Sequence, residues 1–380
     1  MIDRFESSQF ESVRHLFDNI AKYQPMCNAV LEGVYPGKIF VDNHKNPRSA
    51  LLTTFIESEQ HGVWGFLVGE PRNKDFNSDL NRAIYNRQVI STETPLLLLT
   101  CDPDDWDGQM PAVLSPRPPI WMPRWHYVCR QVNYDWRKNL PEGFAVQRLH
   151  TDMLEDGALD LPIDVRTTLE KWAAAESELF SDYGFVTIDQ SGSSPMITGW
   201  ATVDFVAAGM GDLGFFTQPD YRRRGLGTIA AAAALEYGLA NDLFQINWTC
   251  AAGNQGSIRT ASRLGLVRVE DYQMAMLVFD QAEHMGTLGY YALQAKEFTK
   301  SAQAYEKAIE LNPESPDFIY FEAAQAIAMT GEHQKAFVYL SESVRRGWKD
   351  VKQTQECEAF TNLRSYPKWE SVIKEMEKTA

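Results

Sequence analysis

Short apolar runs separated by turn-forming residues dominate the first hundred residues of the 380-residue chain. Their β-branched and aromatic residues favour strands, and we predict strands over residues 38–42, 49–55, 62–69 and 94–100. Residues 76–86 have apolar positions at helical spacing, and Asn77 or Ser78 is the expected cap. The pattern predicts an N-terminal unit of mixed α/β character.

Residues 101–123 read CDPDDWDGQMPAVLSPRPPIWMP and are rich in proline and aspartate. Proline lacks an N–H donor and has a fixed φ, so helices and central strands do not continue through such a segment. We predict an irregular linker that begins at about residue 101 and separates an N-terminal lobe, residues 1–125, from a second domain, residues 126–281.

The second domain alternates strands with helices, which is typical of the α/β class. Strands are predicted over residues 144–149, 184–189, 197–206, 211–217 and 244–250, and two more around a turn within 266–279. Helices are predicted over residues 166–180, 228–240 and 254–265. Asn254 is the expected cap of the last helix, and Gly265 is expected to end it.

Residues 282–380 have a helical pattern with a repeat of their own. Leu288, Gly289, Ser301, Tyr305 and Ala308 have the spacings of a tetratricopeptide repeat, and Ala336 follows Ser301 by 35 residues (336 minus 301), close to the 34-residue period. The segment resembles a short tetratricopeptide array with a capping helix near the C-terminus. Partner binding and a purely packed helical appendage are both open for this all-α domain.

Composition narrows the function classes. The 51 acidic residues exceed the 36 basic ones, giving a net charge of −15, which argues against nucleic-acid binding. The five cysteines are scattered and read as reduced thiols, and no run of 18 apolar residues could span a bilayer. We expect a cytoplasmic protein without a membrane partner. No H-E-x-x-H, G-x-S-x-G or Walker A motif occurs, so no metal is expected.

Positive charge is concentrated in one place, the stretch PDYRRRGLGTIAAAAALEY over residues 219–237. It lies between a predicted strand that ends at Thr217 and an alanine-rich helix. The backbone N–H groups of residues 222–228 can therefore converge on one anion at the helix N-terminus. Gly225 and Gly227 leave room for phosphate, and Arg222, Arg223 and Arg224 add charge.

This arginine loop has two other interpretations, a solvated basic turn and a dinucleotide-binding loop. A solvated basic turn is the ordinary role of such a run. Gly225, Gly227 and Ala230 also match the dinucleotide fingerprint G-x-G-x-x-A, but the next strand ends in Cys250 where an acidic residue would bind a ribose. The order of strand, loop and helix favours phosphate binding outside a Rossmann unit.

The segment Arg222-Arg223-Arg224-Gly225-Leu226-Gly227 matches the pyrophosphate signature Q/R-x-x-G-x-G/A of the GNAT superfamily of N-acetyltransferases, which the chain resembles. The resemblance implies a GNAT fold, acetyl-CoA as co-substrate and a cofactor-binding role for the loop through Leu226 and Thr228. It also implies that Phe215, Phe216 and Thr217 offer backbone groups to the pantetheine arm.

A second segment, NWTCAAGNQGSIRTASRLGL, resembles the zwittermicin A resistance-type group of these enzymes and implies cofactor contacts from Asn254 and Ser257. The likeness extends over residues 1–281, since LEGVYPGKIFVDN and FLVGE look like the N-terminal half of that group. One departure is Ala261, which stands where many GNAT enzymes have a tyrosine that protonates the leaving thiolate.

Direct transfer to an amine needs a group that accepts a proton. Asp212 is the predicted catalytic base, because it opens the strand expected beside the pantetheine arm. An acid that makes a turn hydrogen bond is an equal alternative, and Glu178 and Asp204 are reserves. We therefore predict an N-acetyltransferase acting on a small amine or a protein amine. The alternatives are an inactive adaptor whose tail binds a protein partner and an enzyme whose tail recruits its protein substrate.

Overall fold

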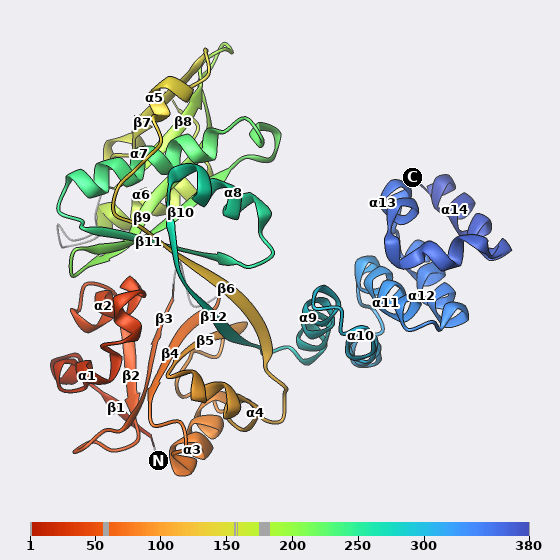
Figure 1. The fold of residues 1–380 in the computed structure, drawn as a ribbon, viewed down its shortest axis with the longest axis horizontal. Coiled ribbons are helices and arrows are strands. Elements are labelled where there is room, and N and C mark those ends of the chain that lie inside the picture. The colour runs from red at the N-terminus through yellow and green to blue at the C-terminus, as the bar shows by residue number, and fades with distance from the viewer. Residues whose placement is uncertain (1, 56–60, 156, 158, 175–182, 380) are drawn as a thin grey trace.

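The structure, a computed structural model, describes residues 2–55, 61–155, 157, 159–174 and 183–379. A large sheet with helices on both faces makes up the N-terminal three quarters of the chain, and a string of helices follows it (Figure 1). In the part of the chain just given, no helix combines the length and apolar character needed to cross a membrane.

The described residues form one mixed sheet of twelve strands, in the order β1-β2-β3-β4-β5-β12-β6-β11-β10-β9-β8-β7. The parallel neighbours are β4 with β5 and β10 with β11, and the other recorded pairs are antiparallel. The strands are β1 (Asp3–Phe5), β2 (Gly37–Val41), β3 (Ser49–Thr54), β4 (Val63–Gly69), β5 (Leu96–Asp102), β6 (Ile120–Cys129), β7 (Phe144–Arg148), β8 (Gly184–Asp189), β9 (Met196–Ala207), β10 (Met210–Thr217), β11 (Gln245–Ala251) and β12 (Val267–Val278).

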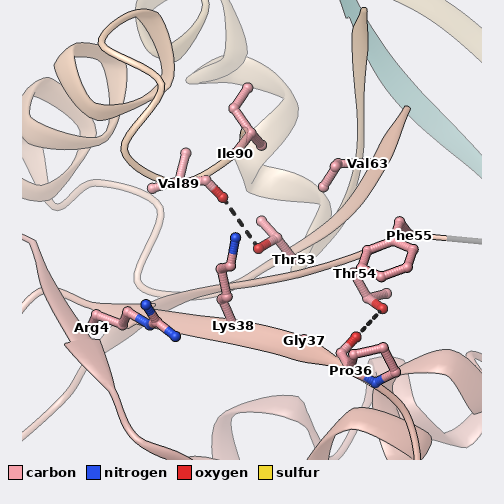
Figure 2. A pocket seen from close by; sticks show the side chains of 10 residues that line it. All are labelled: Arg4, Pro36, Gly37, Lys38, Thr53, Thr54, Phe55, Val63, Val89 and Ile90. Atoms are coloured by element: carbon pink, nitrogen blue, oxygen red, sulfur yellow. Dashed lines mark hydrogen bonds between the residues drawn. The ribbon is translucent and has the colours of Figure 1, made fainter. Parts of the chain in front are cut away.

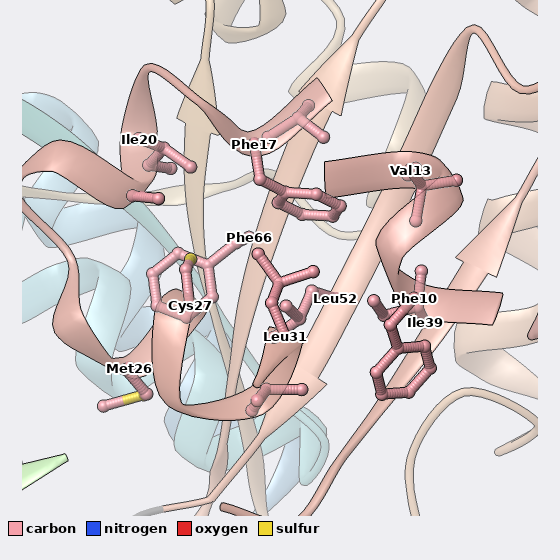
Figure 3. Packing of buried hydrophobic residues seen from close by; sticks show 14 of the residues in the cluster. Phe10, Val13, Phe17, Ile20, Met26, Cys27, Leu31, Ile39, Leu52 and Phe66 are labelled. Atoms are coloured by element: carbon pink, nitrogen blue, oxygen red, sulfur yellow. The ribbon is translucent and has the colours of Figure 1, made fainter. Parts of the chain in front are cut away.

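Short helices cover one face of the N-terminal lobe. They are η1 (Ser7–Val13), α1 (Arg14–Phe17), η2 (Ile20–Lys22) and α2 (Pro25–Leu31). Phe17 and Leu31 from these helices pack against Leu52 and Phe66 of the sheet (Figure 3). The sequence analysis had no helix here, because each piece is too short to show a helical period.

The opposite face of this lobe is covered by α3 (Lys74–Tyr85), η4 (Asp104–Gly108) and α4 (Met110–Val113). The predicted cap of α3 was wrong. Asn73 caps the helix by accepting the Phe76 N–H at 3.2 Å, whereas Asn77 is buried and donates to the Pro71 carbonyl at 2.9 Å.

In the second lobe, α7 (Leu226–Ala240) lies on the sheet and α8 (Gln255–Leu264) beside it. The alanines of α7 are buried, and their small side chains let the helix approach the strands closely. Asn254 caps α8 and Gly265 ends it at a φ of +78°, as predicted. The short α5 (Trp136–Asn139), η5 (Thr151–Leu154) and α6 (Ile163–Ala174) complete this lobe. The end of the helix predicted over 166–180, including Glu178, lies outside the described residues.

Two long strands, β6 and β12, join the lobes, and they correct two predictions. Residues 101–123 are not irregular throughout, because β6 begins at Ile120 and includes Pro123. The Pro123 carbonyl accepts the Ala252 N–H, which lies just past the end of β11. The Pro123 nitrogen, which has no hydrogen to donate, faces this same side of β6, where β11 has already ended. Residues 267–278 form one continuous strand with an irregularity between Arg268 and Glu270 instead of two strands around a turn.

The C-terminal region is all helical, as predicted. It contains α9 (Gln281–Gln294), α10 (Phe298–Leu311), α11 (Asp317–Met329), α12 (His333–Arg345), α13 (Val351–Glu356), η7 (Glu358–Ser365) and α14 (Pro367–Thr379). Gly289 lets the α9 backbone meet α10, because a Cβ there would lie 2.9 Å from the Tyr305 ring. The Ser301 hydroxyl donates to the Gly289 carbonyl at 2.8 Å and fixes the same crossing.

The first of these helices is docked on the sheet. Leu288 of α9 packs with Met122 of β6 and with Met274 and Met276 of β12. Buried His284 ties the same helix down, because its Nδ1 accepts the Val278 N–H at 3.2 Å and its Nε2 donates to the Pro118 carbonyl at 3.0 Å. The helical region is therefore a continuation of the core of the sheet.

A chain that ends at Asp280 should be less stable than the full chain, because the methionines of β6 and β12 would lose their cover. We expect a midpoint of thermal unfolding lower by several degrees, of the order of 5 °C or more, and stronger binding of a hydrophobic dye. A chain ending at Leu311, which keeps α9 and α10, is the control. Equal midpoints for the full chain and the Asp280 chain would show that the docking contributes nothing.

Candidate active site

The central feature of the second lobe is a divergence of two parallel strands. β10 and β11 pair from Met210 with Gln245 to Asp212 with Asn247, where the recorded pairing ends. Beyond that point β10 continues beside β9, and β11 continues beside β6. A gap therefore opens in the sheet, and one edge of β10 from Leu213 to Thr217 faces it with backbone groups that a ligand can use.

Phe215, Phe216 and Thr217 lie on that edge, where the sequence analysis placed them. Phe215 packs edge-on against Trp248 across the gap, with ring centroids 5.0 Å apart, on the face covered by α7 and α8. Phe216 points to the other face, where its ring lies 4.8 Å from that of Trp200. The gap thus has an aromatic lining on both faces.

The arginine loop begins directly after Thr217. A single 3-10 turn, η6 (Pro219–Tyr221), leads to two residues with positive φ, Arg223 at +65° and Gly225 at +84°. Gly225 is the N-cap of α7 and carries no side-chain cap, so the N–H groups of the first turn of the helix, including those of Leu226, Gly227 and Thr228, keep no intrahelical acceptor. This is the geometry of an anion site.

The two glycines have different roles. A Cβ at Gly225 would meet nothing within 4 Å, so this position is open to a ligand and needs glycine for its backbone conformation. A Cβ at Gly227 would lie 2.5 Å from the Thr217 Oγ1 and 3.3 Å from the Phe215 ring. Gly227 is therefore required by the packing of α7 on β10.

The three arginines surround the loop. The Arg222 Nε donates to the Thr217 carbonyl at 3.2 Å, and its guanidinium lies over the Phe216 ring at 5.6 Å. Arg224 lies over the Tyr221 ring at 5.1 Å. Arg223 is exposed. The three guanidinium groups therefore lie in the exposed loop just before the N-terminus of α7.

Asn254 and Ser257 lie at the start of α8. The Asn254 Oδ1 accepts the Ser257 N–H at 3.1 Å, so this oxygen is used in the cap, and the side-chain amide of Asn254 and the Ser257 hydroxyl are what these residues can offer a ligand. Ala261 is fully buried in the core beneath α8. No hydroxyl replaces the family tyrosine at that position.

Asp212 lies where the two strands part. Its side chain is half-buried, and the Oδ1 is covered and has no hydrogen-bond partner among the residues that the structure describes. Burial and, to a smaller extent, the nearby Asp204 carboxylate raise the pKa of Asp212 to about 7, against the opposing effect of the Arg124 charge. Asp204 itself accepts a hydrogen bond from the Thr202 hydroxyl at 2.8 Å. A carboxyl group with this pKa can gain or lose a proton near neutral pH.

A row of polar side chains next to Asp212 was missed by the sequence analysis. The Asn247 Oδ1 accepts hydrogen bonds from His126 at 3.1 Å and from the Gln245 amide at 3.0 Å. Burial lowers the pKa of His126 to about 4, so the ring is neutral, and its Nδ1, which has no partner within the described part of the chain, is an acceptor. Strand pairing places His126, Arg124 and Tyr272 on the face that carries Asp212 and Asn247, which we call the site face.

The signal for this row was present in the sequence. RWHYVC and QINWTC place polar residues at every second position, which in a strand puts them all on one face. The prolines that precede RWHYVC favour an irregular linker, and for this reason the strand with its alternating polar residues was not predicted there.

The two parallel strands therefore diverge between the arginine loop at one end and the Asp212 carboxylate at the other. A model of the family described as GNAT acetyltransferase matches residues 14–275, and the chain belongs to this family. The N-terminal lobe and the second lobe are both included in the match.

The chain is also similar to individual proteins. An uncharacterized N-acetyltransferase of Bacillus subtilis (strain 168), YdfB, is 22% identical over 273 residues, which cover 72% of this chain and 97% of the relative. A GCN5-related N-acetyltransferase-like protein from Streptococcus suis superposes with a TM-score of 0.48 at 21% identity, covering 72% of this chain and 99% of the other.

A glucosamine N-acetyltransferase region of a fungal multi-domain β-N-acetylglucosaminidase superposes with a TM-score of 0.50 at 10% identity, covering 73% of this chain and 38% of that protein. The predicted GNAT fold is confirmed.

Replacing Gly227 with alanine should destabilise the protein, because the new methyl group would collide with Thr217 and Phe215. We expect a loss of about 1–3 kcal/mol of unfolding free energy in chemical denaturation. Gly253→Ala is the matched control, since a Cβ at that loop position meets nothing within 4 Å. Equal stabilities of the two variants would contradict the packing role of Gly227.

Proposed function

We propose that the protein is an acetyl-CoA-dependent N-acetyltransferase that transfers the acetyl group to an amine by direct attack. The observation that carries the proposal is the gap between β10 and β11, with the arginine loop at one end and Asp212 at the other. The six residues from Asp212 to Thr217, five residue steps apart, span ~17 Å of strand, which is of the order of the length of a pantetheine arm.

The cofactor-binding residues follow from this placement. The N–H groups of residues 223–228 and the side chains of Arg222, Arg223 and Arg224 would hold the pyrophosphate. The backbone edge at Phe215, Phe216 and Thr217 would pair with the amides of the pantetheine arm. Asn254 and Ser257 would face the same arm from α8. Acetyl-CoA supplies a thioester that reacts with a neutral amine.

Asp212 would act as the base. An alkylamine is mostly protonated at neutral pH, and the Asp212 carboxylate can take a proton from it directly or through one water. As the C–N bond forms and the C–S bond breaks, the nitrogen gives up its second proton to solvent and the thiolate leaves. Because Ala261 provides no acid, the thiolate would take its proton from solvent. Among the described residues, no cluster of three or more histidine, cysteine or acidic side chains could hold a metal ion.

The helical region supports a second, finer proposal, that residues 282–380 are a short tetratricopeptide-like array that binds a protein. The pairs α9–α10 and α11–α12 have the helix-turn-helix form of such repeats, and Phe318, Met329 and Val338 expose large apolar side chains on α11 and α12. On this proposal the acceptor is either a small amine or an amine of the bound protein. The proposed location of the protein is the cytoplasm.

Charge reversal in the loop tests cofactor binding. Arg223→Glu places a carboxylate beside the expected pyrophosphate without removing a contact of Arg222 or Arg224. We expect the affinity for acetyl-CoA in calorimetry to fall at least about tenfold. Arg263→Glu makes the same charge change in the last turn of α8, outside the arginine loop, and is the matched control. Unchanged binding by the Arg223 variant would remove the loop from the cofactor site.

The pH dependence tests the base. Because Asp212 must be deprotonated to accept a proton, kcat should increase with pH and level off above an apparent pKa near 7. Asp212→Asn should lower kcat by about 10² to 10⁴-fold and abolish the increase of kcat with pH, with acetyl-CoA affinity retained.

Asp204→Asn provides the diagnostic comparison. Removing the neighbouring negative charge should lower the pKa of Asp212 and shift the increase of kcat to lower pH. If the apparent pKa of the kcat–pH profile does not change in Asp204→Asn, or if Asp212→Asn keeps the wild-type kcat, another group is responsible for the titration.

A further inference from the structure

A cleft of about 290 Å³ opens on the site face, at the junction of the two lobes. Its walls come from the segment around η2, from the end of β5 with the start of η4, and from β12. Part of this wall is the Asp-rich sequence CDPDD, for which the reaction proposed above has no use. The cleft is therefore a separate feature of the molecule with chemistry of its own.

The charge of the cleft is negative. Asp102, Asp104 and Glu270 line it, against the single ammonium group of Lys22, which donates to the Asn19 side chain at 3.1 Å. Burial and the two aspartates raise the pKa of Glu270, and burial with the Asp104 charge raises the pKa of Asp102 against a hydrogen bond from Asn19 and the charge of Lys22. The carboxylates repel one another, so a bound cation would relieve an existing electrostatic cost.

Two hydroxyl groups in the cleft wall have unused hydrogen-bonding capacity. Thr100 is 95% buried, and its Oγ1 has no partner among the described residues. The hydroxyl of Tyr272 is likewise covered and without a partner in this part of the chain. Buried polar atoms normally have partners, so these oxygens indicate a ligand that donates hydrogen bonds.

Another cavity shows the contrast. A cavity of about 120 Å³ in the N-terminal lobe is lined by Thr53 and Thr54, among others (Figure 2). There the Thr53 hydroxyl donates to the Val89 carbonyl at 3.4 Å and the Thr54 hydroxyl to the Pro36 carbonyl at 2.7 Å. The hydroxyl groups of that cavity are satisfied within the fold and indicate no ligand.

The acidic cleft lies on the same face of the sheet as Asp212. Strand pairing places Glu270 opposite His126 and Tyr272 opposite Arg124, and the Tyr23 ring at the cleft lies 5.4 Å from the His126 ring. From β10, which carries Asp212, to β12, which carries Glu270, the sheet extends three strand spacings, ~14 Å. An extended molecule with two polar ends about this far apart would match the separation of the two places.

We propose that the acidic cleft binds a second ammonium group of the acceptor, so that the substrate class is a small polyamine with cationic groups separated by roughly 10–15 Å. Asp102, Asp104 and Glu270 provide the countercharge, and the Thr100 and Tyr272 oxygens accept N–H donors. The amine to be acetylated then lies at the strand divergence. This inference rests on the N-acetyltransferase function proposed above.

The experiment compares spermine with butylamine on the full chain, by kinetics with acetyl-CoA and by calorimetry of spermine alone. In the wild type, KM for spermine should be well below that for butylamine and should rise with ionic strength. The double variant Asp104→Asn, Glu270→Gln should raise the spermine KM at least about tenfold more than the butylamine KM, and weaken spermine binding in calorimetry by a similar factor.

Two further variants complete the design. Thr100→Val removes the buried hydroxyl at constant shape and should also weaken spermine binding. Asp105→Asn removes an exposed charge from the same acidic segment outside the cleft and should leave both spermine constants unchanged. Circular dichroism of all variants verifies that they are folded.

The outcomes separate the two proposals. If spermine binds the wild type and the double variant equally, or butylamine is used as efficiently as spermine, the cleft is not an ammonium subsite, although acetyl transfer stands. If neither amine is acetylated but spermine binding is lost in the double variant, the cleft binds polyamines and the proposed enzymatic function is wrong.

Discussion

The divergence of β10 from β11 after the pair Asp212–Asn247 is the constraint on which the site depends. Two parallel strands that stay paired use their backbone groups on each other and offer a ligand nothing between them. Once they part, the edge of β10 beyond Asp212 has no recorded strand partner on that side among the described residues, and the half-buried Asp212 carboxylate lies at the point of separation.

The N-terminal lobe provides an internal comparison. There, too, a parallel strand pair, β4 and β5, is connected by a helix, α3. However, the pairing is continuous from Val63 with Leu97 to Val68 with Asp102, and Asn73 caps the first turn of α3 with its own side chain. The corresponding cap of α7 is Gly225, which caps nothing. The same topology is thus closed in one lobe and open in the other, and the difference depends on local pairing and on one cap residue.

The sequence predicted what depends on local chemistry and not what depends on long-range pairing. The arginine loop, the cap at Asn254 and the end of α8 at Gly265 all follow from residues close together in the chain, and the structure has them where they were expected. The cap at Asn73 was missed because several polar residues near α3 could serve, and burial decided among them. The strand through Pro123 could not be predicted, because proline is tolerated there only where β11 ends.

The polar row on the site face shows why a site can be harder to predict than a fold. His126, Asn247 and Tyr272 come from three strands that are far apart in the sequence, and only the register of β6 with β11 and β12 brings them to one face. The divergence of β10 and β11 exposes one end of that face, and the η2 segment with the Asp-rich turn encloses the other. The acidic cleft and Asp212 therefore lie on one face of the sheet, with the buried polar row between them, and β6 and β12, which join the lobes, set their separation.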